Sequence, residues 1–307
     1  MSLFVSYFCL IIFVKIMVVG AIDVGTNAAR LSVARLSLVD GCVSIERVFY
    51  SRVPLRLGKD VFEKGKLSKK KAEQFIKTMH AFRLLADVHG VEQLRAVATS
   101  AMREASNAQE TTQLIQEITG IELEVISGEE EALLIFESFD FLGLVNQPAY
   151  IVVDVGGGST EVSIFENGTR RASRSFNLGT LRLSDGSTNA GEWHELRIWL
   201  LQEVDLSIDH AIYGTGGNIR KVHDLLDLSD NEAINTVDIY QLHSKMKALT
   251  IDERQKEFRL KADRAEVIVP AMAIFLAVLN TLNGSSIYAP KLSLSDGIML
   301  HAFRQLK

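Results

Sequence analysis

Two short stretches of this sequence place carboxylates beside glycines in a pattern that suits phosphate chemistry. One reads YIVVDVGGGSTEVSI over residues 150–164 and sets three consecutive glycines between Asp154 and Glu161. The other reads VVGAIDVGTNAARLSV over residues 18–33, so that its Asp23 corresponds to Asp154. Both aspartates end apolar runs, where an isolated charge is costly. We therefore expect Asp23 and Asp154 to hold a divalent cation such as Mg²⁺; hydrogen bonding of each carboxylate to its own turn is the simpler alternative.

Glycine-rich turns follow three predicted strands, at Gly25, at Gly156 to Gly158 and at Gly214 to Gly217. Because glycine has no Cβ, successive backbone N–H groups in such turns can approach an anion closely and form a binding nest. Each turn alone could be purely structural. Three of them, with flanking Asp or Thr residues in a repeated sequence, indicate a phosphate-binding cleft.

The elements that position these turns can be predicted from the hydrophobic pattern. Alternating apolar and polar residues predict a meander of three strands that starts at Met17, with a turn at Asp40-Gly41. The pattern then predicts a capped helix over 68–90, a strand over 93–99, a helix from about Asn107 to Thr119 and a strand over 122–127. This alternation is typical of an α/β domain with a mixed sheet.

The strand signals return around the second glycine turn. They include a hairpin turn at Asn167-Gly168, and Ser163 stands where Ser32 stands in the first stretch. One internal repeat of strand, glycine turn and hairpin predicts a duplicated fold with two equivalent domains.

Gly128 opens a predicted helix whose first turn carries Glu129, Glu130 and Glu131. The helix dipole favours acidic residues at this end, so capping alone would explain them. Catalysis is the alternative, and a base in the first turn of a helix should stay ionised.

Composition limits the class of protein. The chain has 307 residues, 47% of them apolar, which predicts two domains of roughly 150 residues each. A net charge of −5 argues against nucleic acid as a partner but allows an anion in a locally basic cleft. Cys9 and Cys42 are too few for a disulfide scaffold, and the seven histidines form no HExxH pair. We expect a cytoplasmic protein whose metal, if any, has oxygen ligands.

Residues 1–16 form an apolar N-terminal extension in which Lys15 is the single charge. The run is shorter than the roughly 20 residues that span a bilayer, and it lacks the flanking residues of a secretory signal. Two interpretations stay open: upstream sequence before a true start at Met17, or a helix that associates with a membrane surface or a partner. Neither predicts stable membrane insertion.

Several segments occur in the order and spacing of one enzyme family. They read DVGTNAARL, ATSAMREASN, ISGEEEALLIF, VDVGGGSTEVSIF, NLGTLRL, GTGGNIRKV and KADRAEVIVPAMAIF. From Val18 to the C-terminus the sequence resembles the exopolyphosphatase/guanosine pentaphosphate phosphohydrolase (Ppx/GppA) family, in its short two-domain subclass. The pair DVGGGSTE and SGEEEA is the specific part of the match, since DVGTN alone would fit many actin-like or sugar-kinase-like proteins.

The resemblance implies an α/β fold of two ribonuclease-H-like domains around a central cleft, the actin-like, acetate and sugar kinase superfold. Residues 17–128 would form the first domain and residues 129–307 the second, whose C-terminal helix could pack back on the first. The resemblance also implies a homodimer that releases terminal phosphate from inorganic polyphosphate, guanosine pentaphosphate or both, with Mg²⁺ as cofactor.

Matched positions carry roles over from the family. Glu131 corresponds to the general base that activates water, and Glu161 to the second catalytic glutamate. Asp154 corresponds to the metal-associated aspartate and Asp23 to the carboxylate of the first phosphate loop. The phosphate-binding positions implied by the turns and the resemblance are Gly25, Thr26, Asn27, Arg30, Ser100, Arg103, Gly156, Gly157, Gly158, Ser159, Thr160, Gly216 and Gly217.

Departures from the family pattern bear on substrate preference and turnover. Ala28 replaces a serine, Asn218 replaces a threonine, and Ser295 with Asp296 stand where many members have an Arg-Glu or Arg-Asp pair. Two alternatives therefore stay open: an ATP-dependent kinase or ATPase of the same superfold, and a non-catalytic regulator that binds a phosphate ligand. Polyphosphate and the guanosine nucleotide present the same terminal group, so the sequence does not choose between them.

Overall fold

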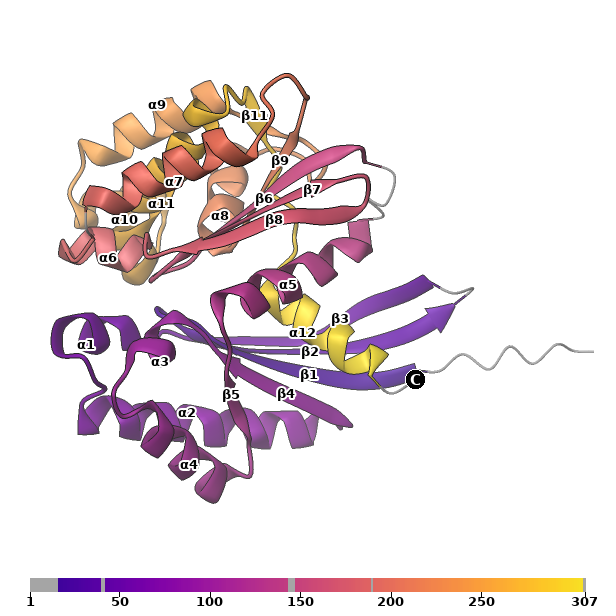
Figure 1. The fold of residues 1–307 in the computed structure, drawn as a ribbon. Coiled ribbons are helices and arrows are strands. Elements are labelled where there is room, and N and C mark those ends of the chain that lie inside the picture. Colours follow the sequence, from indigo (N-terminus) through magenta and orange to yellow (C-terminus); the bar gives the residue numbers. More distant parts are fainter. Residues whose placement is uncertain (1–15, 40–41, 143–146, 189, 306–307) are drawn as a thin grey trace, which may run out of the picture.

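The computed structural model describes residues 16–39, 42–142, 147–188 and 190–305, which form two lobes, one above the other in Figure 1. The predicted extension up to residue 15 and the predicted turn at Asp40-Gly41 lie outside the described residues. Among the residues that are described, no helix is both long and apolar enough to cross a membrane.

The first lobe is built on a sheet of order β3-β2-β1-β4-β5. Its first three strands form an antiparallel meander, and the other two run parallel to β1. The strands are β1 (Ile16–Val24), β2 (Ala29–Val39), β3 (Cys42–Val53), β4 (Gln93–Ala98) and β5 (Leu123–Val125). The predicted mixed sheet is confirmed.

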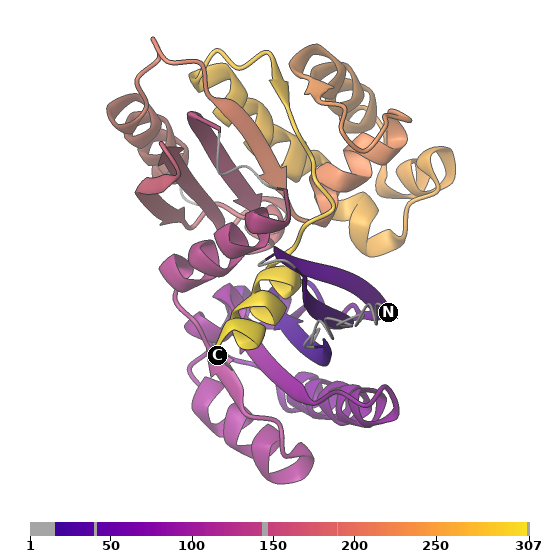
Figure 2. The same ribbon diagram turned by 90° about the vertical axis from the view of Figure 1, so that its right-hand side faces the viewer.

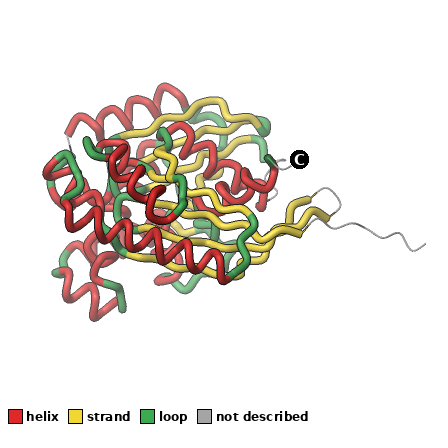
Figure 3. Tube along the Cα trace, turned by 90° about the horizontal axis from the view of Figure 1, so that it is seen from below, coloured by secondary structure: helices red, strands yellow, loops and turns green. Residues whose placement is uncertain are grey.

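The helices of this lobe are α1 (Leu57–Lys64), α2 (Lys69–Val88), α3 (Ser100–Glu104) and α4 (Ala108–Thr119). α2 begins at the predicted cap, where the Ser68 hydroxyl accepts a hydrogen bond from the Lys71 N–H at 3.3 Å. α2 and α4 cover the outer face of the sheet (Figure 1) and lie in front of its strands when the molecule is seen from below (Figure 3). The pattern did not predict α1 and α3, because helices of eight and five residues are too short to show a helical period.

The second lobe repeats the meander in a sheet of order β8-β7-β6-β9. Its strands are β6 (Ala149–Val155), β7 (Thr160–Glu166), β8 (Thr169–Phe176) and β9 (Ala211–Thr215), with β9 parallel to β6. Tyr288 extends the sheet beyond β9, since its backbone exchanges hydrogen bonds of 2.8 Å with Ile212 and Gly214. The other elements are α6 (Thr180–Asp185), α7 (Ala190–Glu203), α8 (Gly217–Leu225), β10 (Ile234–Asn235), α9 (Thr236–Lys247), α10 (Ile251–Phe258), α11 (Ala262–Thr281), β11 (Ser286–Ile287) and α12 (Leu294–Arg304).

The duplication extends to the irregularities of the two sheets. The pairing of β2 with β3 shifts after Val33, and that of β7 with β8 shifts after Ile164. Each of these bulges lies ten residues beyond the aspartate that ends the first strand of its meander, Asp23 or Asp154. The Asn167-Gly168 hairpin has φ values of 51° and 74°, as a two-residue type I′ turn requires. The prediction of duplicated ribonuclease-H-like folds is confirmed, while the boundary between residues 128 and 129 stays a prediction.

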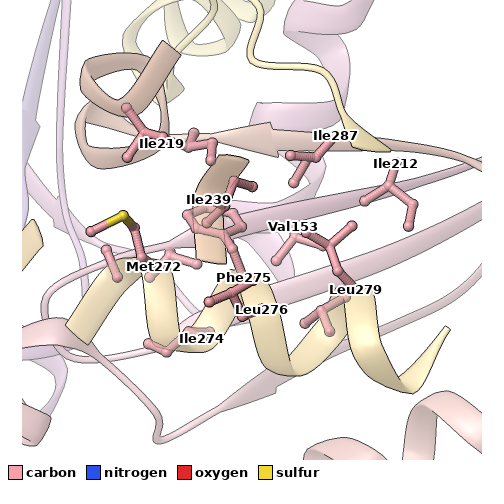
Figure 4. Close-up of a cluster of buried hydrophobic side chains, with 14 of the residues drawn as sticks. Val153, Ile212, Ile219, Ile239, Met272, Ile274, Phe275, Leu276, Leu279 and Ile287 are labelled. Atoms are coloured by element: carbon pink, nitrogen blue, oxygen red, sulfur yellow. The ribbon is translucent and has the colours of Figure 1, made fainter. Parts of the chain in front are cut away.

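The central strands are buried on both faces, which explains their unbroken apolar runs. Successive side chains of a strand point to opposite faces. Val153 and Val155 of β6 therefore face the helices of the second lobe, where Val153 packs near Phe275 and Leu279 of α11 (Figure 4). Val152 faces the other way and belongs to a core shared between the lobes.

Helices α5 (Gly128–Ser138) and α12 lie side by side between the two lobes (Figures 1 and 2). α12 packs against β1, and α5, which is followed by the short helix η1 (Phe139–Leu142), packs against β7 and β8. Their apolar residues share one core with Val19 and Ala21 of β1 and with Val152 of β6. The two sheets are thus joined through the packed pair of α5 and α12.

This helix pair predicts a specific sensitivity at Gly297, in the middle of α12. A Cβ there would lie 1.7 Å from the carbonyl oxygen of Leu134 in α5. Because that oxygen is backbone and cannot rotate away, Gly297→Ala should lower the free energy of unfolding by about 1–3 kcal/mol or more, although alanine is the better helix former. Urea unfolding would measure the change, with the exposed α9 substitution Gln241→Ala as control. An unchanged midpoint for Gly297→Ala would contradict the contact.

Candidate active site

The β1–β2 turn and the β6–β7 turn meet between the two lobes. In each turn the first glycine N–H donates to the carbonyl three residues later, at 3.1 Å for Gly25 and 2.9 Å for Gly156. A Cβ at Gly157 would lie 2.9 Å from the Cβ of Thr26 in the opposing turn. The two turns therefore touch, and glycine is required at position 157 by this close approach.

One cleft is lined by these turns, by the β9–α8 turn and by the first residues of α3, α11 and α12. It contains most of the predicted site residues: Asp23, Gly25, Thr26, Asn27, Arg30, Ser100, Glu131, Asp154, Gly156, Gly157, Gly158, Ser159, Gly216 and Gly217. Thr160 does not line it, because this residue is fully buried and donates a hydrogen bond to the Leu178 carbonyl. Arg103 and Glu161 lie just outside the lining and contact residues that form it.

The cleft also holds side chains that the sequence motifs did not single out as ligands. They are Arg52, Thr99, Thr180, Asn218, Arg264, Val267, Ser293 and Leu294. Arg264 lies against the β9–α8 turn, since its Nη2 would be 2.9 Å from a Cβ at Gly217. Burial lowers the pKa of Arg264, and the nearby charge of Arg52 lowers it further. An anion in the cleft would relieve this crowding of cations.

Three carboxylates gather where the two lobes meet. One oxygen from each of Glu131, Asp154 and Glu161 lies within 4.8 Å of the others. They come from α5, β6 and β7, and Glu161 lies directly opposite Asp154 in the sheet. Glu131 is 7% exposed and Glu161 is 2% exposed. Arg103 offsets part of this charge, with its Nη1 2.9 Å from Glu131 Oε2 and its Nη2 3.9 Å from Glu161 Oε1.

This crowding raises the pKa of each carboxyl group. Burial, together with the charge of Glu161, holds the pKa of Glu131 well above its usual range. Burial and the charge of Asp154 raise the pKa of Glu161 to about 7. Burial also raises the pKa of Asp154, although Thr215 donates a hydrogen bond of 2.5 Å to it. In the site without a cation, the expectation that the helix dipole keeps Glu131 ionised is wrong. Desolvation and the neighbouring negative charge raise the pKa of Glu131 by more than the dipole lowers it.

The donor set fits a divalent cation. Glu161 Oε2 is buried and, within the described part of the chain, has no hydrogen-bond partner. Carboxylate oxygens are ligands that Mg²⁺ prefers, with its remaining positions filled by water or substrate phosphate. A cation among Glu131, Asp154 and Glu161 would satisfy the free oxygen and favour the ionised form of all three groups.

Asp23 has a different environment from Asp154. Arg30 Nη1 lies 2.7 Å from Asp23 Oδ2. Burial acts to lower the pKa of Arg30, but the charge of Asp23 and its hydrogen bond raise that pKa overall. Arg30 faces Asp23 in the first sheet as Glu161 faces Asp154 in the second. The three-carboxylate group thus forms around the second turn, and the metal role of Asp23 stays a prediction.

Ion pairs join the lobes around the cleft. They are Arg52–Asp263 at 2.5 Å, Arg56–Glu266 and Arg182–Glu104. Arg182 is the most buried of these arginines, and its Nε donates a hydrogen bond of 2.7 Å to the Gly158 carbonyl. Its guanidinium also lies over the Phe62 ring of α1, 3.9 Å from the ring centroid. This arginine ties the second glycine turn to the first lobe.

The positions that depart from the family pattern lie in different surroundings. Ala28 is fully buried, whereas Asn218 lines the cleft. Ser295 is only 1% exposed. Asp296 caps the start of α12 and pairs with Arg47 of β3 at 2.8 Å. Asp296 therefore stabilises the packing of α12 on the first lobe.

Comparison with known proteins agrees with this geometry. The model of the Ppx/GppA phosphatase family matches residues 36–305. Exopolyphosphatase 1 of Mycobacterium tuberculosis is 26% identical over 301 residues, which cover 92% of this chain and 87% of that protein. The guanosine-5'-triphosphate,3'-diphosphate pyrophosphatase of Aeromonas salmonicida is 24% identical over 295 residues, covering 91% of this chain but 58% of that longer protein.

Solved structures show the same architecture. The PPX-GPPA enzyme of Aquifex aeolicus superimposes with a TM-score of 0.76 at 26% identity, covering 94% of this chain and 100% of the other. An exopolyphosphatase-like protein gives a TM-score of 0.79 at 26% identity, with 95% and 100% covered. Because the family model spans most of the sequence and these structures span nearly the whole fold, the chain belongs to the Ppx/GppA phosphatase family.

Proposed function

We propose that the protein is a Mg²⁺-dependent phosphoanhydride hydrolase that releases terminal phosphate from inorganic polyphosphate, guanosine pentaphosphate or both. The observation that carries this proposal is the three-carboxylate group of Glu131, Asp154 and Glu161 at the meeting point of two glycine turns. The names of the relatives, exopolyphosphatase and guanosine-5'-triphosphate,3'-diphosphate pyrophosphatase, support the same class of substrate.

Substrate phosphates would bind between groups from both lobes. The glycine turns offer backbone N–H dipoles, which bind anions without any change of charge. Arg30, Arg52 and Arg264 add positive charge to the cleft wall. Guanidinium groups match the planar spacing of phosphate oxygens and remain charged when buried.

Glu131 is placed to accept a proton from the attacking water. It lines the cleft, and Arg103 holds its Oε2 at 2.9 Å, so that Oε1 is available to the water. Glu161 is fixed from the other side by the Ser175 hydroxyl, which donates to its Oε1 at 2.8 Å. Mg²⁺ bound among the carboxylates would supply neutralisation of the charge that develops on the transferred phosphoryl group.

The alternatives have less support in the site. The hypothesis of a non-catalytic regulator depends on Ala28 and Ser295, which depart from the family pattern, but neither residue lines the cleft. A kinase or ATPase of the same superfold would use the same fold and turns, so it is distinguished by its acceptor. Cytoplasmic location and a homodimer stay predictions from the sequence.

A phosphate-release assay tests the proposal directly. We expect release from short polyphosphate, long polyphosphate or guanosine pentaphosphate without an added acceptor, and loss of release when EDTA removes Mg²⁺. If no phosphate is released from any of the three substrates, the hydrolase assignment is wrong. Transfer of phosphate from ATP to a small acceptor would favour the kinase instead.

Substitution of Glu131 tests its role as base. Glu131→Gln keeps the shape of the side chain but removes its basicity, so kcat should fall by about 10²- to 10⁴-fold. Thermal unfolding should show that the variant is folded. Glu129→Gln on the same helix is the matched control, because its side chain is 83% exposed and should leave kcat unchanged. Near-full activity of a folded Glu131→Gln would show that another group activates the water.

The raised pKa of Glu161 predicts a pH-dependent stability. Glutamate in an unfolded chain has a pKa of about 4.3, whereas the pKa of Glu161 in the folded protein is about 7. The contribution of Glu161 to the free energy of unfolding is fully present below the pKa of the unfolded chain and is lost as pH rises towards 7. Over this interval the unfolded chain releases a proton that the folded protein still holds.

Melting temperatures in EDTA at pH 5 and pH 8 would measure this effect. We expect the parent to lose more stability over this interval than Glu161→Gln, which cannot titrate at that position. Added Mg²⁺ should restore the parent mainly at pH 8, since it binds the ionised carboxylates. An identical pH dependence for parent and variant would argue against the shifted pKa.

A further inference from the structure

A second cavity opens on the other side of the catalytic glutamates. Its lining includes Arg103, Glu104, Ser175, Asn177, Arg182 and Ser187. We propose that this second cavity is the exit for product phosphate, which leaves through it while the shortened substrate chain still occupies the first cleft. The inference rests on the proposed function and adds the order in which the products leave.

The position of the two cavities follows from one row of residues across the second sheet. Thr215 of β9, Asp154 of β6, Glu161 of β7 and Ser175 of β8 are direct neighbours in register. Hydrogen bonds of 2.5 Å from Thr215 to Asp154 and of 2.8 Å from Ser175 to Glu161 show that these side chains share one face. The first cleft lies over the β9 and β6 end of this row, and the second cavity lies over the β8 end.

Arg103 contacts both spaces. Arg103 lines the second cavity, yet its Nη1 is 2.9 Å from Glu131, which lines the first cleft. Its Nη2 also reaches the Ser159 hydroxyl of the first cleft at 3.5 Å. Ser175 is exposed and touches Glu161, which is almost fully buried. Small movements of Arg103 would therefore join the two spaces.

The geometry of phosphoryl transfer gives this arrangement a direction. The attacking and leaving oxygens lie roughly in line on opposite sides of phosphorus. The water oxygen forms the new P–O bond, Glu131 takes the water's proton, and the bridging P–O bond breaks with its electron pair staying on the remaining chain. If the chain lies in the first cleft over β9 and β6, the released phosphate lies on the β8 side, next to Arg103.

The charges of the second cavity suit passage of an anion more than tight binding of an anion. Arg103 supplies positive charge at the inner end. Arg182 is already occupied by Glu104 and by the Gly158 carbonyl. Glu192, further along the lining, accepts a hydrogen bond from the Asn177 N–H at 3.0 Å. A phosphate that has passed Arg103 thus meets no unpaired arginine among these lining residues, so the second cavity offers it no strong binding site on the way to solvent.

Product inhibition distinguishes the two exits. If phosphate leaves first through the second cavity, added inorganic phosphate binds the enzyme that still holds its chain, and inhibition against polyphosphate is noncompetitive. If phosphate can leave only through the first cleft, the chain must leave before it, and inhibition is competitive. Both patterns are measured from initial rates at constant free Mg²⁺.

A variant that narrows the second cavity completes the test. Ser187→Trp places a large side chain in its exposed lining, and Ser244→Trp on the exposed surface of α9 is the control for an added tryptophan. We expect Ser187→Trp to lower steady-state kcat at least about five-fold, because product release becomes limiting. The first turnover, followed by rapid quench, should keep its parental rate, and the control should match the parent throughout.

Noncompetitive inhibition of the parent together with slowed release in Ser187→Trp would support the exit. Competitive inhibition of the parent, or a Ser187→Trp variant with parental kcat, would overturn the exit and leave the hydrolase assignment intact. A parent that releases no phosphate from any substrate would instead overturn the proposed function, and the exit with it.

Discussion

The architecture is organised around holding three like charges together away from water. Glu131, Asp154 and Glu161 repel one another when they are ionised, and Glu131 and Glu161 are almost fully buried, so the approach of the three groups to within 4.8 Å has to be imposed by the surrounding packing. Asp154 and Glu161 are fixed as neighbours in one sheet. Glu131 is brought to them by α5, which is held in place by α12 and by the core that both sheets share. Apolar burial thus provides the free energy that keeps the three carboxylates close together.

The two lobes show how one duplicated turn can serve two electrostatic roles. Both meanders place an aspartate at the end of the first strand and a charged residue opposite it. In the first lobe the opposite residue is Arg30, which neutralises Asp23 within the turn. In the second it is Glu161, whose pKa is raised to about 7 by burial and by the charge of Asp154. The difference of one residue type separates an aspartate that is paired with a cationic side chain from an aspartate that lies beside a second carboxylate.

Much of this arrangement is predictable from the sequence, and the features that are not predictable share a physical reason: they depend on contacts between distant parts of the chain. The strands, the hairpin at Asn167-Gly168 and the glycine turns have local signals, because period-two patterns and glycines reflect local backbone geometry. Arg264 has no comparable local signal, since its place beside Gly217 depends on how α11 docks. The raised pKa of Glu131 is opposite to the direction expected from its own helix, because burial and the neighbouring Glu161 decide the shift and neither is visible in the local sequence.

The two lobes are connected differently at the two ends of their interface. At Gly297 the backbones of α5 and α12 are in contact within an apolar core, which does not depend on ionic strength. Around the cleft the connections are ion pairs such as Arg52–Asp263, which dissolved ions screen and phosphate oxygens can replace. Raising the ionic strength should therefore loosen the contact between the lobes at the cleft, while the apolar contact of α5 with α12 keeps them joined.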